Sequence, residues 1–369
     1  MVTTQIYTLV NSVNQQAFGS GALTATDPAG LISIGNQVLS SSTNTEAFLN
    51  TLLQRVGRTV IRYRMYNNKL RNLVVDDMQW GAILQKIHPL MPDAVADDMY
   101  TLTDGQSIDH YEVKKPQATQ KLFVTRAPYM FFITIQRETL REAFLSESAM
   151  AAFISAIFGQ VQNKIETTLE NLGRLTIAAG IAEANAREYA LVTAYNSLTG
   201  PGAPLTAATA MFSSDFLRFA LKTMKRVMDG MTDMSELYND GTVPSFTPYE
   251  DQRIIVLSEF EYALETVVEW AAFNEQYVKL ENFTKLNFWQ EANAPGSILT
   301  TTLSTSAQVG IDNVIACVHD RDALGVYQEF NETLTTPVNA RGAYYNTFFH
   351  RRDGRFVDTS ENLVFFTLN

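Results

Sequence analysis

The stretch AFISAIFGQVQNKIETTLENLGRL, residues 152–175, decides the architecture that the sequence predicts. No proline occurs from about Ser146 to Ala186, and apolar residues recur at spacings of three and four, as on one face of a helix. This apolar series consists of Phe153, Ile157, Val161, Ile165, Leu169 and Leu172. A helix of about 40 residues extends about 60 Å, roughly twice the width of a small domain. We therefore expect one helix that a single lobe cannot bury.

Residues 1–44, by contrast, are rich in Ser, Thr, Asn, Gln and Gly. The runs FGSGALTATDPAG and SSSTNT are typical of loops, and we expect neither a long helix nor a dense core in this segment. It is predicted to be either a floppy tail or an arm that orders against another surface. A short amphipathic helix is expected to begin near Thr45. A strand is expected in TVIRYRMYNN, residues 59–68, because apolar and basic side chains alternate there.

The rest of the chain contains an extended part and a mixed lobe. Residues 80–130 have few helix signals and too little apolar content for a core of their own, and Asp104-Gly105 is a turn signature. We expect a long excursion that resembles a β-hairpin. Residues 191–336 combine amphipathic helices with the apolar strands RIIVL and NVIACV, which predicts a mixed α/β lobe. The tail, residues 346–369, is expected to form two strands around a turn at Arg351–Gly354.

Composition limits the class and the compartment of the protein. A chain of 369 residues is expected to form two or more lobes. Its net charge of -11 repels nucleic acid and anionic membranes unless a local basic patch intervenes. Cys317 is the single cysteine, which excludes an internal disulfide and fits a reducing compartment. The chain starts without a secretory signal pattern, and no run approaches the about 18 apolar residues of a membrane span, so we expect a cytoplasmic protein.

No combination of residues predicts the site of an enzyme. The histidines lie scattered, at none of the spacings of metal ligands; they are His88, His110, His319 and His350. The sequence has neither a G-x-S-x-G elbow nor a phosphate loop ending in Gly-Lys-Ser or Gly-Lys-Thr. Cys317 lies in an apolar strand and is expected to be a buried structural residue. The pairs Asp76-Asp77 and Asp97-Asp98 could bind a cation but are more typical of solvated surface. We expect no catalytic, cofactor or metal site.

One basic run stands out in this acidic chain. It is RVGRTVIRYRMYNNKLR, residues 55–71, and its basic residues are Arg55, Arg58, Arg62, Arg64, Lys69 and Arg71. The run can be a solvated strand face. It can equally make electrostatic contact with acidic neighbours or with packaged nucleic acid. Both interpretations stay open, and these six residues are the candidates for an assembly or DNA-facing surface.

The order of these elements resembles the major capsid protein of tailed bacteriophages, which has the Hong Kong 97-like fold. The stretch ITIQRETLREAFLSESAMAAFISAIFGQVQNKIETTLENLGRL is similar to the strand and spine helix of a small-genome, podovirus-like branch of that family. ACVHDRDALGVYQEFNETLTTPVN and the final RFVDTSENLVFFTLN are similar to its closing part. The resemblance covers nearly the whole chain. It implies an α+β fold with an N-terminal arm, an extended β-hairpin loop, a long spine helix and a mixed α/β axial domain.

The resemblance also implies six segments along the chain. They are an N-terminal arm (1–57), a strand of the peripheral domain (58–79), the extended loop (80–130), the peripheral domain with the spine helix (131–190), the axial domain (191–336) and the closing strands of the peripheral domain (337–369). Nothing before residue 45 reads as a long charged helix, so a separate scaffolding protein is expected as a partner.

The function that the resemblance implies is structural rather than enzymatic. Copies of the chain are expected to self-assemble into pentamers and hexamers of an icosahedral virion capsid around packaged double-stranded DNA. Scaffolding and portal proteins are the expected partners, the host bacterial cytoplasm is the expected place of assembly, and neither a membrane nor a cofactor is expected to take part. The alternative is an encapsulin-like nanocompartment shell that holds protein cargo, although the polar N-terminal arm argues mildly against it. An enzyme of unfamiliar type, with its site in the axial lobe, is a third hypothesis that no motif supports.

Overall fold

The computed structural model describes residues 3–56, 66–75, 84–109, 111–200, 204–271 and 283–369. The chain divides into two compact units. Unit 1 comprises Met1–Trp80, Arg126–Leu175 and Gly325–Arg355, and unit 2 comprises Gly81–Thr125, Thr176–Leu324 and Phe356–Asn369. Helix and strand both contribute to each unit, in keeping with the expected α+β class. The predicted six-segment division stays a prediction.

The long helix predicted from residues 152–175 is present. Helix α6 (Glu147–Ile154), a π-helical turn (Ser155–Gly159) and helix α7 (Gln160–Glu183) follow one another without a break. The helix begins at Ser146, whose side chain accepts a hydrogen bond of 3.2 Å from the backbone N–H of Ala149. The predicted apolar face is confirmed within unit 1, since Ile165 and Leu169 are buried against Val326 of strand β11.

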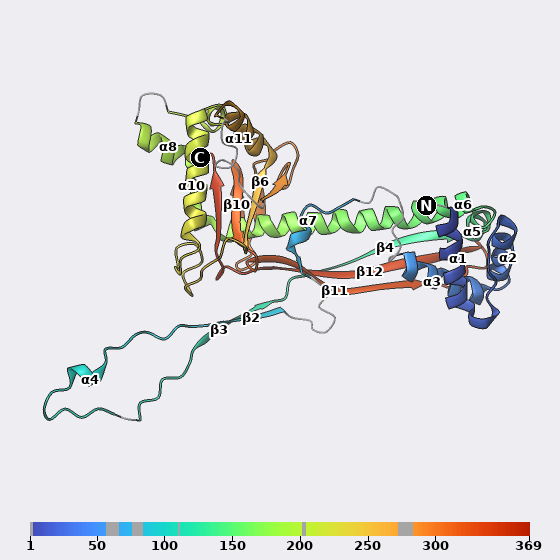
Figure 1. Ribbon diagram of the computed structural model, residues 1–369, viewed down its shortest axis with the longest axis horizontal. Coiled ribbons are helices and arrows are strands. Elements are labelled where there is room, and N and C mark those ends of the chain that lie inside the picture. The colour runs from blue at the N-terminus through green and yellow to red at the C-terminus, as the bar shows by residue number, and fades with distance from the viewer. Residues whose placement is uncertain (1–2, 57–65, 76–83, 110, 201–203, 272–282) are drawn as a thin grey trace. The chain divides into compact units, whose positions relative to one another are not determined.

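Unit 1 contains a four-stranded sheet beside this helix. Its strands are β1 (Val74–Val75), β11 (Leu324–Thr335), β12 (Tyr344–Val357) and β4 (Arg126–Gln136), in the order β1-β11-β12-β4. The β12 and β4 strands pair antiparallel from Tyr344↔Gln136 to Gly354↔Arg126, and Figure 1 shows β4, β12 and β11 side by side. Side chains alternate in burial along β4, so one face of the sheet lies inward and the other lies open.

The N-terminal part of unit 1 is a helical cluster, which corrects the expectation of a loop-like arm without a core. Helices α1 (Thr3–Phe18), α2 (Pro28–Leu39) and α3 (Ser42–Val56) pack with α5 (Arg137–Ala143) and α6. The residues that form the core include Val10, Val13, Leu31, Ile34, Val38, Phe48 and Leu52, all fully buried. These residues recur at helical spacing among many polar residues, so composition concealed the apolar stripe.

The loop signals in this region were right between α1 and α2 and at Ser40-Ser41, between α2 and α3. Gly19 has a φ of +58°, and Asp27 accepts a hydrogen bond of 2.7 Å from the backbone N–H of Gly30 and so caps α2, with Pro28 at its first position. The short helix expected near Thr45 is confirmed as α3, which begins at Ser42. The predicted strand over residues 59–68 lies mostly outside the described residues, and residues 66–68 are neither helix nor strand.

Unit 2 contains the predicted mixed α/β lobe. Its sheet has the order β5-β13-β10-β6-β7, made by Glu188–Ala190, Leu363–Thr367, Val314–Asp320, Gln252–Leu257 and Phe283–Leu286. Helices α8 (Leu191–Thr199), α9 (Ala207–Ala210), α10 (Ser214–Gly230) and α11 (Ser258–Ala271) belong to the same lobe. A small hairpin of β8 (Ile298–Thr301) and β9 (Gln308–Ile311) completes it. Cys317 on β10 is fully buried, as predicted, and burial raises the pKa of its thiol to about 12.

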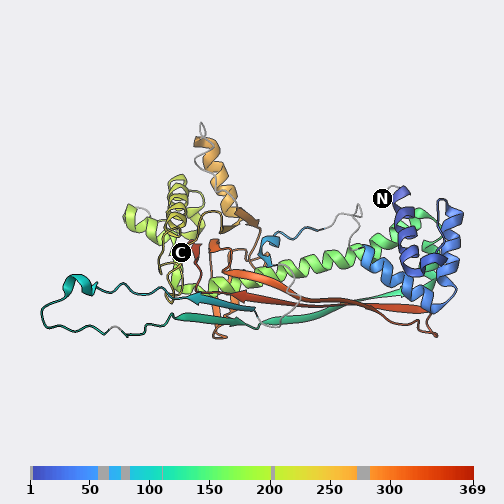
Figure 2. The same ribbon diagram turned by 60° about the horizontal axis from the view of Figure 1, so that its bottom comes forward.

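The extended excursion predicted for residues 80–130 is a β-hairpin of unit 2, except that its last residues, 126–130, already belong to β4 of unit 1. Strand β2 (Leu84–Pro89) pairs antiparallel with β3 (Ala118–Phe123), from Leu84↔Phe123 to Pro89↔Ala118. Residues 90–117 are called the hairpin loop below, and the one-turn helix α4 (Asp98–Thr101) is the only helix or strand among those of them that the structure describes. Gly105 has a φ of +86°, which confirms the turn predicted at Asp104-Gly105. Figures 1 and 2 show the two strands continuing into the long open loop.

The predicted turn at Arg351–Gly354 is wrong, because β12 runs straight through it. All four residues pair with β4, and the chain instead turns at residues 358–362 before β13. Gly354 has a packing role, since a Cβ atom there would overlap the buried ring of Tyr327 on β11. A glycine flanked by polar residues resembles a turn in the sequence, although here it makes room for an aromatic ring.

Candidate functional site

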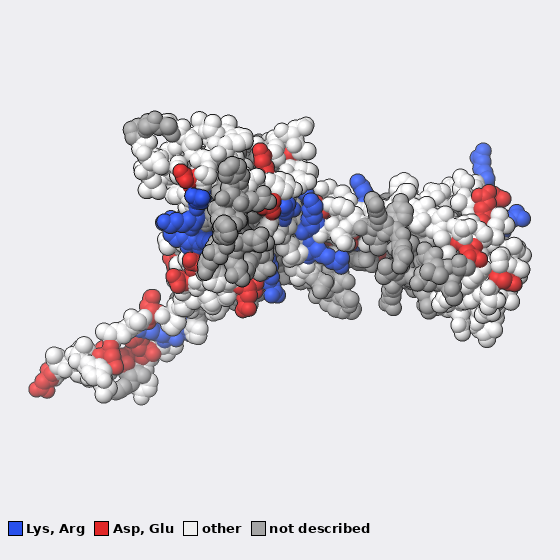
Figure 3. Space-filling model, turned by 45° about the horizontal axis from the view of Figure 1, so that its top comes forward, with Lys and Arg blue, Asp and Glu red and all other residues white. Residues whose placement is uncertain are grey.

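The hairpin loop exposes an unusual amount of apolar surface. Its large exposed apolar side chains are Met91, Val95, Met99, Tyr100, Leu102, Tyr111 and Val113, and Tyr100 and Tyr111 are 81% and 89% exposed. The loop also carries Asp93, Asp97, Asp98, Asp104, Asp109 and Glu112, and Figure 3 shows Asp and Glu atoms gathered along it. Exposed apolar groups in such number are typical of a surface that a partner covers.

A cluster of charges fastens the base of the hairpin to the rest of unit 2. Asp358, between β12 and β13, is fully buried. Its carboxylate lies 3.3 Å from the ammonium groups of both Lys86 on β2 and Lys121 on β3, and 3.0 Å from Nε2 of His88. The same carboxylate accepts a hydrogen bond of 3.1 Å from the backbone N–H of Ser360. Both hairpin strands are therefore tied to one buried acid.

The surroundings shift the pKa of each acid in this cluster. Burial acts to raise the pKa of Asp358, but Lys86, the Ser360 N–H and Lys121 outweigh it, so this pKa lies below its usual range. Burial dominates at Glu361 and raises its pKa. Asp240 accepts from Thr242, Thr359 and Lys121, and these bonds lower its pKa despite burial. The cluster therefore holds Asp358 and Asp240 ionised beside two lysines.

Three residues of the cluster have the chemistry of metal ligands. One donor atom each of His88, Asp358 and Glu361 lies within 4.8 Å of the others. Two ammonium groups already lie 3.3 Å from Asp358 and supply the positive charge that a cation would bring. The arrangement fits an ion-pair anchor better than a metal centre. Sequence reasoning missed this anchor, because His88 and Asp358 are far apart along the chain. The one local signal is Asp-Thr-Ser at 358–360, which has the pattern of an Asx turn.

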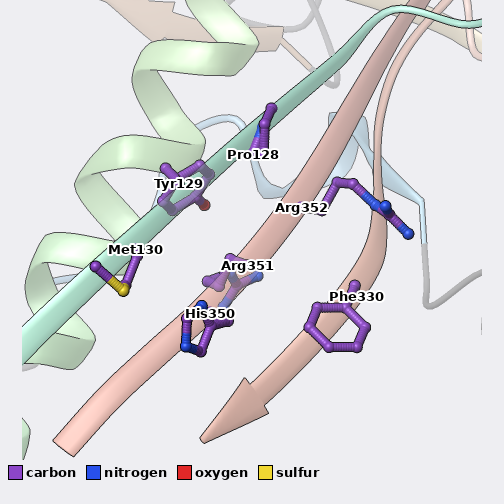
Figure 4. Close-up of a pocket in the computed structure, with 7 residues that line it drawn as sticks. All are labelled: Pro128, Tyr129, Met130, Phe330, His350, Arg351 and Arg352. Atoms are coloured by element: carbon purple, nitrogen blue, oxygen red, sulfur yellow. The ribbon is translucent and has the colours of Figure 1, made fainter.

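The open face of the sheet in unit 1 is a second exposed apolar surface. Met130, Phe132, Phe330 and Leu334 on β4 and β11 are 42–64% exposed, and we call them the open sheet face. A groove of about 420 Å³ lies on these strands, lined by Pro128, Tyr129, Met130, Phe330, His350, Arg351 and Arg352, as Figure 4 shows. The guanidinium of Arg352 lies 6.0 Å from the centre of the Phe330 ring. This surface can accept an apolar partner.

Charged side chains at the groove pair with one another across the strands of the sheet. Glu329 on β11 lies 3.3 Å from the guanidinium of Arg126 on β4 and 3.1 Å from that of Arg352 on β12. Asp353 accepts a hydrogen bond from the hydroxyl of Tyr129 and lies 3.6 Å from Arg351. Burial and Asp353 together raise the pKa of the Tyr129 phenol well above its usual value. These side chains are engaged with one another across three strands, and they hold the sheet as one surface.

Most of the predicted basic run lies outside the residues that the structure describes. Arg58, Arg62 and Arg64 lie outside the described residues, and Arg55 is placed only by its backbone in α3. Lys69 and Arg71 are exposed in the turn before β1, on either side of the buried Leu70. Asp76-Asp77 is also outside the description, whereas Asp97 caps α4 through the backbone N–H of Met99 at 3.0 Å. Among the described helices, none is long and apolar enough to cross a lipid bilayer.

Comparisons with known proteins identify the family and the fold of the chain. A family model described as Phi29-like phage major capsid protein matches residues 9–367. The major capsid protein of Bacillus phage PZA is 23% identical over 98% of this chain and 73% of that protein, and that of Bacillus phage B103 is 21% identical over 94% and 69%. The capsid structure of Staphylococcus phage Andhra matches 84% of this chain and 87% of its own chain, with 11% identity and a TM-score of 0.57. The fold similarity confirms the expected Hong Kong 97-like fold.

Proposed function

Because this chain belongs to the Phi29-like phage major capsid protein family, it forms the capsid shell of a phage, and we propose that the hairpin loop of one subunit covers the open sheet face of its neighbour. The encapsulin-like alternative is not favoured, because the matched family and relatives are phage capsid proteins. The family is structural, and we propose that the chain has no catalytic role.

One observation carries this proposal: the subunit exposes two large apolar surfaces, one on an extended loop and one on a sheet. Fully burying a large apolar side chain contributes about 1.5–3 kcal/mol. The hairpin loop alone presents seven exposed side chains of this kind, and the open sheet face presents four more.

The finer parts of the assembly follow from the same proposal. A loop that binds a different surface on the next copy makes a heterologous contact, which closes into rings when its rotation closes. We propose pentamers and hexamers of this kind in an icosahedral shell around packaged double-stranded DNA. Scaffolding and portal proteins would act as partners, and assembly would take place in the host bacterial cytoplasm.

The basic run stays a proposed assembly or DNA-facing surface. Arg55, Arg58, Arg62, Arg64, Lys69 and Arg71 are proposed to contact neighbouring subunits or DNA, and the exposure of Lys69 and Arg71 supports this. The division into arm, peripheral domain, extended loop and axial domain is likewise proposed. In this proposal the α1–α3 helical cluster takes the place of a purely extended arm.

A double substitution in the hairpin loop tests the proposal. Tyr100→Ser with Tyr111→Ser removes two of the most exposed apolar groups without touching the β2–β3 pairing, so the subunit should stay folded. The variant is expected to form few or no closed particles by negative-stain electron microscopy, with unchanged thermal unfolding of the subunit. Thr101→Ser with Thr103→Ser is the matched control in the same loop and should assemble normally. Normal particles from the tyrosine variant would refute the proposed contact.

A further inference from the structure

The strands at the base of the hairpin present two unlike faces. Side chains alternate in burial along both β2 and β3, so every second residue of each strand lies on the same side. We call the half-buried side, which lies toward the body of unit 2, the inner face. The opposite side is exposed to solvent, and we call it the outer face. The outer face consists of Gln85, Ile87, Pro89, Ala118, Gln120 and Leu122.

The inner face holds the charges of the hairpin. Lys86 and Lys121 are directly opposite one another on the two strands, where like charges repel. The buried carboxylate of Asp358 offsets this repulsion, since it lies 3.3 Å from both ammonium groups. An aromatic contact adds to the ion pairs, because the rings of Phe123 and Phe356 lie 5.5 Å apart. The hairpin is therefore held to its own subunit mainly through charged groups.

The outer face has the opposite character. It contains no acidic or basic residue, and its two large apolar side chains, Ile87 and Leu122, are 62% and 55% exposed. These two lie diagonally across the strand pair, because Ile87 is opposite Gln120 and Gln85 is opposite Leu122. An antiparallel sheet with one solvated face normally turns its apolar side inward and its polar side outward. This hairpin does the reverse.

The buried acid explains why the hairpin keeps this orientation. If the outer face packed on the body of unit 2 instead, Lys86 and Lys121 would move away from Asp358 and leave a buried carboxylate without its partners. Removing the partners of a buried charge is strongly destabilising. The charge cluster thus keeps Ile87 and Leu122 in solvent in the free subunit. Apolar groups that a fold holds outward in this way are typical of a surface that a partner covers.

We propose that a second copy of this chain covers the outer face of the hairpin in the assembled shell. The inference rests on the proposed function, because both strands continue directly into the hairpin loop, which is proposed to bind a neighbouring subunit. It extends that contact from residues 90–117 back along residues 84–89 and 118–123. The contact is driven by apolar burial between uncharged groups, so salt should weaken it little.

Charges placed on the outer face test the inference in the full-length chain, co-expressed with the assembly proteins of its phage. Ile87→Lys with Leu122→Lys and Ile87→Glu with Leu122→Glu change the net charge in opposite directions, so net charge cannot explain a defect that both share. Both positions are more than half exposed, so the thermal unfolding of the unassembled subunit should stay unchanged. Ile87→Val with Leu122→Ile keeps the face apolar and is the matched control.

Sedimentation and electron microscopy measure the yield of closed particles. Each charged pair is expected to lower this yield about tenfold or more, because the contact would bury charges that have no partner. The control should assemble normally. Wild-type yields from either charged pair would overturn the inference and leave the proposed function standing.

Photo-cross-linking identifies the partner without placing a charge on the face. The photoreactive residue p-benzoylphenylalanine replaces Gln120, which is exposed and lies opposite Ile87. Irradiated particles are expected to contain cross-linked pairs of this chain, whereas irradiated unassembled subunits should contain none. Particles that yield no cross-link, or cross-links only to another protein, would overturn the inference. If the wild-type chain formed no particles, the proposed function itself would fail, and the inference with it.

Discussion

Asp358 is the residue at which a single substitution should loosen the hairpin most. Its carboxylate is fully buried and lies within 3.3 Å of Lys86, His88 and Lys121, which all come from the hairpin strands. Asp358→Asn keeps the shape of the side chain and an oxygen that can accept from the Ser360 N–H. It removes the negative charge that both lysines contact. The amide nitrogen replaces one carboxylate oxygen and cannot accept a hydrogen bond, so the substitution tests the ion pairs together with the hydrogen bonds that they include.

The expected loss follows from how deeply each partner is buried. Breaking a fully buried ion pair costs about 3–5 kcal/mol. The side chains of Lys86 and Lys121 are 20% and 28% exposed, so water can partly replace the lost contact with the carboxylate. Because exposed pairs contribute only about 0–1 kcal/mol, we expect an intermediate loss of about 2–3 kcal/mol in the free energy of unfolding of unit 2 at pH 7.

The pH dependence provides a second signature. The pKa of Asp358 is lower in the folded protein than the value of about 3.9 for an unfolded chain. A lowered pKa contributes stability that is present above the unfolded pKa and is lost as pH falls through the folded pKa. The difference between wild type and Asp358→Asn should therefore be full at pH 7 and shrink steadily below about pH 4.

Two measurements on the unassembled subunit check these expectations. Urea unfolding at pH 7 and at about pH 3 gives the free-energy difference and its pH dependence. Hydrogen exchange at pH 7 should show faster exchange of the paired amides of β2 and β3 in Asp358→Asn. Asp104→Asn, in the exposed turn of the hairpin loop, is the control and should change neither. An Asp358→Asn subunit as stable as wild type at pH 7, with unaltered exchange in β2 and β3, would show that the charge cluster does not fasten the hairpin.

Two further substitutions test the packing of unit 1. Ile34→Ala should lower the free energy of unfolding of the unassembled subunit by about 2–5 kcal/mol, because Ile34 is fully buried in the α1–α3 core. Ile32→Ala, at a residue 41% exposed on the same helix, is the control and should lower it far less. Equal urea midpoints for the two variants would mean that these helices do not pack in the free subunit. Gly354→Ala should lower the free energy of unfolding by about 1–3 kcal/mol, because the added methyl group crowds the buried Tyr327 ring. Gly21→Ala is the control and should be nearly neutral, since no atom lies within 4 Å of the added Cβ. An unchanged melting temperature for Gly354→Ala would contradict the packing role of this glycine.

Local patterns were enough to identify the long elements. The spine helix was predicted because an apolar face at helical spacing and the absence of proline are properties of the sequence alone, and Ile165 and Leu169 are buried as that spacing requires. The hairpin was predicted in the same way, from turn chemistry at Asp104-Gly105 and a low apolar content. The order of these elements along the chain then supported the family and the fold, because that order can be read directly from the sequence.

Other features depended on which residues meet in three dimensions. Residues 1–44 resemble a loop by composition, yet a few apolar residues such as Val13 and Ile34 suffice once neighbouring helices bury them together. Gly354 resembles a turn until Tyr327 of the adjacent strand occupies the space beside it. Lys86 and His88 have no partner nearby in sequence, and only the return of the chain to Asp358 makes them an anchor.

The sequence by itself therefore determined the elements whose cause is local: the long helix, the extended hairpin, the buried strands and the overall acidity. Tertiary structure alone decided which apolar residues are buried and which remain exposed, and where opposite charges meet or stand apart. Burial and ion pairing depend on distances between residues that are remote along the chain. For this reason the hairpin loop and the open sheet face became visible as surfaces only in the folded chain.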